Sequence, residues 1–181
     1  MKNRLRKSFV NAAECKHGGK VQEAKRRLGA EPLDFSANIN PLGSPPLKEL
    51  VSRELKQVGH YPDSSYQGFC RAASRFVQVD PGCIVPGNGS SELIRIFAEA
   101  VLEEGDLAII PTPTFGEYEN QSQLAGGRTE RLAIGKDGTP LLRDSDLHRA
   151  KALFLCNPNN PTGRLLSQNQ VHDLADRCEE A

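Results

Sequence analysis

Residues 87–89 (Gly-Asn-Gly) form a glycine turn that opens directly into a helical pattern beginning at Ser90. The start of a helix presents unpaired backbone N–H groups and the positive end of the helix dipole, and both suit a phosphate group. The turn is not a P-loop, which needs Gly-Lys-Ser/Thr, and it is not a dinucleotide fingerprint, because Glu92 stands where the third glycine belongs. By itself the motif predicts an ordinary helix cap or a phosphate site, and the cap is the more frequent of the two.

Two further motifs each follow an apolar run of strand length. Phe115 lies in a Pro-Thr-Pro-Thr-Phe-Gly stretch after residues 107–110, and Asn160 lies in an Asn-Pro-Thr-Gly stretch after residues 152–156. At the carboxyl end of a parallel strand, an aromatic ring can stack on a flat ligand and an amide can donate to a phenolate-like oxygen. On the same residues, Phe115 fits a core position at a helix entrance and the amide loop fits a plain turn.

Composition disfavours several other classes of function. The 181 residues contain 23 Lys plus Arg and 23 Asp plus Glu, so there is no basic excess to bind nucleic acid. No apolar run approaches the roughly 18 residues of a membrane span, and the basic N-terminus lacks the apolar segment of a secretory signal. The five cysteines form no Cys-x-x-Cys pair, and the four histidines show no metal-ligand spacing. We therefore expect a cytoplasmic protein with no metal, no nucleic-acid partner and no membrane segment.

The apolar patterns predict an alternation of helices and strands that can position these motifs. We expect helices over residues 21–28, 47–58, 66–77, 115–124 and 144–149, and from residues 90 and 167 onward; we expect strands over residues 84–85, 107–110, 128–134 and 152–156. Such an alternation is typical of a three-layer α/β fold with a mostly parallel sheet and flanking helices.

The order and spacing of the three motifs resemble the class I/II aminotransferases, a group of pyridoxal-phosphate enzymes. Within that group, residues 17–20 (His-Gly-Gly-Lys), 34–43 (Asp-Phe-Ser-Ala-Asn-Ile-Asn-Pro-Leu-Gly) and 61–63 (Tyr-Pro-Asp) are similar to the threonine-phosphate decarboxylases of cobalamin biosynthesis. Histidinol-phosphate aminotransferases are near relatives. The resemblance runs from about Cys15 to the last residue.

This resemblance implies a partial fold-type I pyridoxal-phosphate domain over residues 46–181, preceded by an N-terminal helical arm and a substrate-contacting loop over residues 1–45. It implies a pyridoxal 5′-phosphate site built from Gly89, Ser90, Ser91, Phe115, Asn160 and Tyr61. It also implies a site for a small phosphorylated amino acid, built from His17, Gly18, Asn38 and Asn160. Ser90 and Ser91 would hold the cofactor phosphate with Gly89, Phe115 would stack on the ring, and Asn160 would bond the ring oxygen O3′.

The implied reaction is the decarboxylation of L-threonine O-3-phosphate to (R)-1-aminopropan-2-yl phosphate, carried out by a homodimer at full length. A histidinol-phosphate-type aminotransferase and an inactive fragment are the alternatives. In these enzymes the Schiff-base lysine follows the Asn-Pro-Thr-Gly helix, beyond the stretch seen here. Lys136 lies in a glycine-rich turn and Lys151 precedes its strand, so neither is placed to replace it. We therefore expect no catalytic residue within this stretch, and an isolated chain that is inactive.

Overall fold

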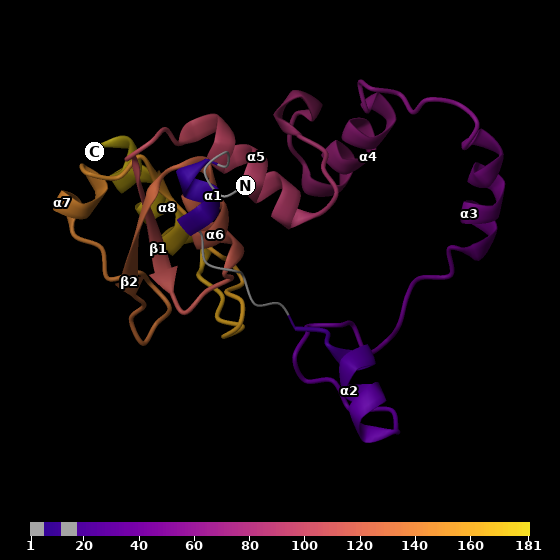
Figure 1. Cartoon of the computed structure of the whole chain (residues 1–181). Coiled ribbons are helices and arrows are strands. Elements are labelled where there is room, and N and C mark those ends of the chain that lie inside the picture. The colour runs from indigo at the N-terminus through magenta and orange to yellow at the C-terminus, as the bar shows by residue number, and fades with distance from the viewer. Residues whose placement is uncertain (1–5, 12–17) are drawn as a thin grey trace. The chain divides into compact units, whose positions relative to one another are not determined.

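A computed structural model describes residues 6–11 and 18–181 of the chain (Figure 1). Contacts divide the chain into two compact units, one made of residues 1–15 and 87–181 and the other of residues 16–86. The division into an arm over residues 1–45 and a cofactor-binding part over residues 46–181 concerns roles rather than contacts, and it stays a prediction.

The larger unit is built on a three-stranded parallel sheet of order β2-β1-β3. Its central strand β1 (Leu107–Thr112) pairs with β2 (Arg128–Ala133), which lies beside it in Figure 1, and with β3 (Ala152–Leu153). Residues 107–111 are all buried, as expected of an apolar run that has a strand on either side. The predicted parallel sheet with flanking helices is confirmed, and β3 is shorter than the predicted range of 152–156.

One face of this sheet is covered by α5 (Ser90–Val101) and α6 (Glu117–Ala125), which pack against each other. The buried core between them and the sheet consists of Ala98, Leu102, Ala108, Ile110, Ala152 and Phe154. The ring of Phe154 stacks on Tyr118, with 5.1 Å between centroids, and meets Phe97 edge-on at 5.5 Å. These ring contacts bring α5, α6 and the segment after β3 together.

Two further helices, one at each end of the chain, belong to this unit. The short helix α1 (Lys7–Asn11) contacts α6, and Arg6 Nη2 donates to the carbonyl of Ala125 at 3.4 Å. The C-terminal helix α8 (Gln168–Glu179) begins at Ser167, as predicted, with a capping box formed by Ser167 and Gln170.

A buried carboxylate organises the connection between β2 and β3. Asp146 lies in the one-turn helix α7 (Asp144–Leu147), and its side chain is 1% exposed. It accepts hydrogen bonds from the backbone N–H of Arg143 at 3.0 Å, from the Arg143 guanidinium at 2.8 and 3.0 Å, and from Arg149 at 3.2 Å. Arg149 also pairs with Glu130 of β2 at 3.2 Å. The hydrogen bonds from Arg143, and then those from Arg149, hold the pKa of the Asp146 carboxyl well below its usual range.

We expect Asp146→Asn to lower the thermal midpoint of unfolding by more than about 5 °C, because two guanidinium groups lose their shared anion. The lowered pKa also fixes the direction of a pH effect. Asp146 stabilises the fold above its unfolded pKa near 4, and this contribution is lost as the pH falls further. Thermal melts between pH 7 and pH 3 check both points. The matched control is Asp173→Asn, an exposed acid on α8; equal melting losses in the two variants would contradict the assignment.

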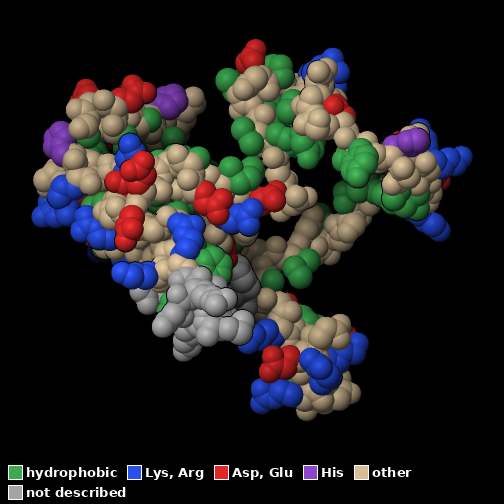
Figure 2. All heavy atoms as spheres, turned by 45° about the horizontal axis from the view of Figure 1, so that its top comes forward, with side chains coloured by type: hydrophobic (Ala, Val, Ile, Leu, Met, Phe, Trp, Pro, Cys, Tyr) green, Lys and Arg blue, Asp and Glu red, His purple; other side chains and the backbone are tan. Residues whose placement is uncertain are grey.

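The smaller unit, residues 16–86, is helical. It contains α2 (Val21–Leu28), α3 (Lys48–Glu54) and α4 (Gln67–Val77), with 3₁₀ turns at Leu55–Gln57 and Pro81–Cys83. The bounds of α2 agree with the predicted helix, which ends at Gly29 in the left-handed conformation with φ of 66°. None of these three helices buries a residue within the described structure, and apolar side chains gather at the surface over α3 and α4 (Figure 2).

The strand predicted at residues 84–85 is wrong. A strand needs a hydrogen-bonded partner, and neither β2 nor β3, the two edge strands of the sheet, pairs with this segment. Within the described residues, Ile84 and Val85 join no ladder, and Pro86 has no N–H to donate to one. The stretch before the glycine turn is therefore irregular.

Across the described ranges, no helix has both the length and the apolar character that crossing a membrane requires. The same residues contain no group of three or more His, Cys, Asp or Glu side chains arranged to hold a metal ion.

Candidate functional site

The Phe115 loop and the Asn160 loop lie at the same edge of the sheet. The Phe115 loop follows the carboxyl end of β1. The Asn160 loop comes shortly after β3, and β3 pairs in parallel with β1. In the sheet, β2 lies on one side of β1 and β3 lies on the other, so the connection from β2 to β3 crosses back over β1. Because such crossovers are right-handed, this reversal sends successive connections to opposite faces. A crevice at the carboxyl ends of β1 and β3 results, and ligands of α/β sheets bind at such points.

Phe115 stands at the entrance to α6. Its ring is half-buried and meets the Tyr118 ring edge-on, with 6.0 Å between centroids and 88° between planes. Burial raises the pKa of the Tyr118 hydroxyl well above its usual range, and the adjacent Cys156 sulfur raises it further. Tyr118 is therefore a neutral support behind Phe115 at any physiological pH.

Asn160 is half-buried in the loop after β3. Its backbone N–H donates to the Cys156 sulfur at 3.4 Å, which closes the loop on the end of the strand segment. The hydrogen bond found for Asn160 among the described residues uses its backbone N–H and leaves its side-chain amide available. An amide in this position can donate to a ligand oxygen without first breaking a bond inside the protein.

The neighbouring Asn159 joins the two loops directly. Its Oδ1 accepts from the hydroxyl of Thr114 at 2.9 Å, and its Nδ2 donates to the carbonyl of Pro113 at 2.9 Å. The same Nδ2 donates to the hydroxyl of Thr162 at 2.8 Å. Sequence reasoning assigned Asn159 no role, because its partners on the Phe115 loop lie 45 and 46 positions earlier.

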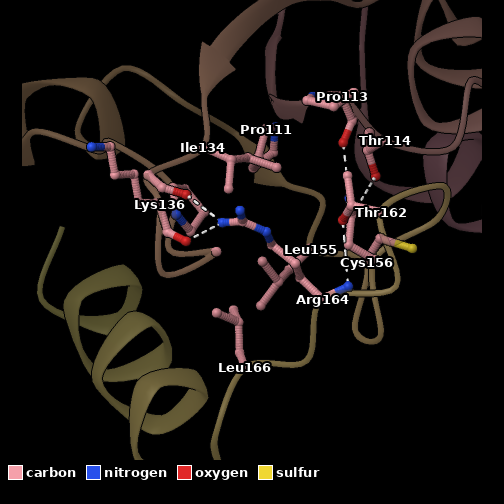
Figure 3. Close-up of a pocket in the computed structure, with 14 residues that line it drawn as sticks. Pro111, Pro113, Thr114, Ile134, Lys136, Leu155, Cys156, Thr162, Arg164 and Leu166 are labelled. Carbon is pink, nitrogen blue, oxygen red and sulfur yellow. Dashed lines mark hydrogen bonds between the residues drawn. The ribbon is translucent and has the colours of Figure 1, made fainter.

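Two hollows flank this junction. One has a volume of about 330 Å³ and is walled by Pro111, Leu155 and Leu166; Figure 3 shows Arg164 reaching across it. The Arg164 guanidinium donates to the carbonyls of Gly135, at 3.1 Å, and Lys136, while the Lys136 side chain points away. The hollow therefore contains a cation whose hydrogen bonds are partly used by backbone oxygens.

The other hollow is open, with a volume of about 450 Å³, and is lined by Phe115 and Pro161 together. Its far wall contains Glu119 and Arg131, whose guanidinium Nε donates to both carboxylate oxygens at 3.0 and 3.1 Å. The structure thus brings Phe115 next to Pro161 of the Asn-Pro-Thr-Gly loop, whereas the described residues that line this hollow include neither Asn160 nor residues 89–91.

The start of α5 is free of a side-chain cap. Its N-cap residue is Gly89, with φ of 89°, which has no side chain that could bond the first-turn N–H groups. Ser90 and Ser91 are exposed there. Glu92 turns back instead, accepting from the backbone and side-chain nitrogens of Asn88 at 2.6 and 3.1 Å, and these bonds lower its pKa. An anion at this twelve-residue helix would meet unpaired N–H groups and two hydroxyls, so the residues fit a phosphate.

Of the residues assigned to the substrate, Gly18 and Asn38 lie in the smaller unit and Asn160 lies in the larger one. Gly18 packs on the backbone of Ser36 so closely that a Cβ would stand 1.8 Å from the Ser36 carbonyl oxygen. The N–H of Gly19 donates to the Ser36 hydroxyl at 2.8 Å. The structure therefore brings Gly18 and Gly19 to the loop that contains Asn38, whose side chain is exposed. His17 lies outside the described residues.

Tyr61 belongs to the same unit and is fully exposed, with a relative exposure of 101%. Its assignment to a phosphate across a dimer interface stays a prediction.

Comparison with known proteins agrees with this arrangement. Residues 30–181 match the family described as aminotransferase class I and II. The threonine-phosphate decarboxylase of Salmonella typhimurium is 37% identical over 171 residues, which cover 90% of this chain and 46% of that protein. A histidinol-phosphate aminotransferase of Ruminiclostridium cellulolyticum is 31% identical over 159 residues, covering 82% and 44%. The chain spans about half the length of the relatives that it matches.

Solved structures share the fold. Histidinol-phosphate aminotransferase from Sinorhizobium meliloti, in complex with pyridoxal-5′-phosphate, superimposes with a TM-score of 0.81 at 19% identity, over 96% of this chain and 48% of that one. An aspartate aminotransferase from Thermus thermophilus gives a TM-score of 0.78 at 22% identity, over 97% and 50%. With its motifs, its parallel sheet and a family match over residues 30–181, the chain belongs to the class I and II aminotransferases.

Proposed function

We propose that this chain is part of a pyridoxal-phosphate enzyme that decarboxylates L-threonine O-3-phosphate to (R)-1-aminopropan-2-yl phosphate. The observation that carries the proposal is the crevice between β1 and β3, where Phe115 and the Asn-Pro-Thr-Gly loop line one hollow. Similarity to the Salmonella decarboxylase over 90% of the chain supports the choice of reaction.

Each cofactor-binding residue has a physical task in this proposal. The first turn of α5, with Gly89, Ser90 and Ser91, binds the phosphate through N–H groups and hydroxyls. Phe115 covers one face of the ring, and Asn160 donates its free amide to the O3′ oxygen. Pyridoxal phosphate, when bound, supplies an electron sink for the bond that breaks at the substrate Cα.

The substrate residues determine which bond breaks. Decarboxylation requires the bond from Cα to the carboxylate to stand perpendicular to the cofactor ring, so the substrate has to be held at both ends. Gly18, which packs on Ser36 two positions before Asn38, is assigned to this role together with Asn38 and His17. Tyr61 would complete the phosphate contacts of a second copy in a homodimer, for which its full exposure leaves it available.

A histidinol-phosphate-type aminotransferase is the second candidate. Several relatives with that description are about as similar, including those at 31% identity over 159 residues and 29% identity over 180 residues. Both reactions use the same cofactor-binding residues, so the difference lies in how the substrate is held.

Product analysis at full natural length distinguishes the two. We expect the protein, supplied with pyridoxal phosphate, to release CO₂ from L-threonine O-3-phosphate in stoichiometric yield with the phosphorylated amino alcohol. With histidinol phosphate and 2-oxoglutarate, we expect glutamate formation at least about tenfold slower, which corresponds to roughly 1.4 kcal/mol of transition-state discrimination. Glutamate formed without CO₂ release would replace the first candidate by the second.

A further inference from the structure

The amide of Asn159 is buried and its orientation is fixed. The residue is 9% exposed, and both of its Nδ2 protons and its Oδ1 have partners. The carbonyl of Pro113 can only accept a hydrogen bond, so the amide nitrogen must face it. The backbone around Asn159 is also closed, because its N–H donates to the carbonyl of Arg164 at 2.7 Å and its carbonyl accepts from Gly163 at 2.7 Å.

Asn159 lies next to both of the proposed ligand contacts, Phe115 and Asn160. Its partner Thr114 directly precedes Phe115 in the chain, and Asn159 itself directly precedes Asn160. One side chain therefore connects the backbone that bears the ring to the backbone that bears the amide. A displacement of either loop at this junction would change the angle between the ring face and the amide donor.

We infer that Asn159 is a positioning residue for the cofactor, which holds Phe115 and Asn160 at the mutual angle that a flat ligand requires. The inference rests on the proposed function. Asn159 does not touch the ligand itself in this proposal; it acts by linking the Thr114 hydroxyl and the Pro113 carbonyl to the Asn-Pro-Thr-Gly loop.

The chain offers a matched control in the same loop. Asn157 also makes two side-chain hydrogen bonds, accepting from the N–H of Leu166 at 2.8 Å and donating to its carbonyl at 3.4 Å. Those bonds fasten the loop to the segment before α8 and do not reach Pro113 or Thr114. A general loosening of the loop should therefore appear in Asn157→Ala as well, whereas a loss of cofactor geometry should be confined to Asn159 variants.

The test measures pyridoxal-phosphate affinity by equilibrium dialysis, on the protein at full natural length, beside the thermal midpoint of each variant without cofactor. We expect Asn159→Ala and Asn159→Asp to raise the dissociation constant about tenfold or more, and Asn157→Ala to raise it less than about twofold. Thr114→Val, which removes one bond at little change in shape, should raise it severalfold. Thr114→Ser, which keeps the hydroxyl, should restore parental affinity.

The outcomes separate this inference from the proposed function. If the parent protein itself does not bind pyridoxal phosphate, the proposed function fails. If the parent binds and the Asn159 variants bind equally well, or if Asn157→Ala loses as much affinity as Asn159→Ala, the positioning role fails alone. Should the Asn159 variants not fold, the Thr114→Val and Thr114→Ser pair decides, and equal affinities in that pair overturn the inference.

Discussion

The 181-residue polypeptide by itself should release no CO₂ from L-threonine O-3-phosphate above the rate of free pyridoxal phosphate. Pyridoxal-phosphate catalysis needs a lysine amine placed at the reactive carbon of the cofactor and a group that fixes the charge of its ring. The resemblance assigns both to the part of the relatives that this sequence does not span, since it covers 46% of the Salmonella enzyme. The first turn of α5, Phe115 and Asn160 would remain, and we expect them to support only weak, non-covalent binding.

Borohydride reduction in the presence of pyridoxal phosphate, followed by peptide mapping, checks this expectation. No single lysine of the polypeptide should be labelled in stoichiometric yield. Addition of a segment that corresponds to the C-terminal part of the relatives, fused or as a second chain, should restore cofactor labelling and CO₂ release together. Stoichiometric labelling of Lys151 or Lys136 in the 181-residue chain, with turnover, would contradict the prediction.

Phe154→Ala should destabilise the larger unit by about 3–5 kcal/mol, the range for removing a buried aromatic ring. Phe154 is 8% exposed and lies in the core cluster, stacked on Tyr118 and edge-on to Phe97. Its removal would leave a cavity where α5, α6 and the end of the sheet meet. Denaturant unfolding with linear extrapolation measures the loss.

Phe76→Ala is the matched control for this substitution. The same ring is removed, but Phe76 is 87% exposed at the end of α4, so we expect a change within about 0.5 kcal/mol. A loss as large as that of Phe154→Ala would mean that the packing around β3 is not the core of the protein.

Much of the fold could be predicted because its signals are local. The apolar run at residues 107–110 became β1, the helix after Gly89 became α5, and the Ser167 cap began α8. The strand at residues 84–85 failed for a non-local reason, because apolar character cannot supply the neighbouring strand that a ladder needs. The burial of Asp146 was not predicted, for a similar reason. An aspartate in a polar stretch is expected to be exposed, and Asp146 can be buried only because Arg143 and Arg149 pair with its charge.

The individual residues of the candidate site could be predicted from the sequence, but the contacts that join their loops could not. The sequence motifs identified Phe115 and Asn160, and the structure brings their loops to one edge of the sheet. The junction at Asn159 depends on Pro113 and Thr114, which are far away in the chain, and no residue pattern marks a hydrogen bond over that separation.

The strand order also bears on how the chain acquires its shape. Leu107 pairs with Arg128, which is 21 positions later, whereas Ala108 pairs with Ala152, which is 44 positions later. The entropic cost of closing a loop rises by about 0.6 kcal/mol each time the loop doubles in length. The β1–β3 pairing therefore has the larger entropic cost of the two. During synthesis on the ribosome, β1, α6 and β2 can pack together before the residues of β3 have been synthesised. The crevice between β1 and β3 therefore forms after the β1–β2 pair during biosynthesis.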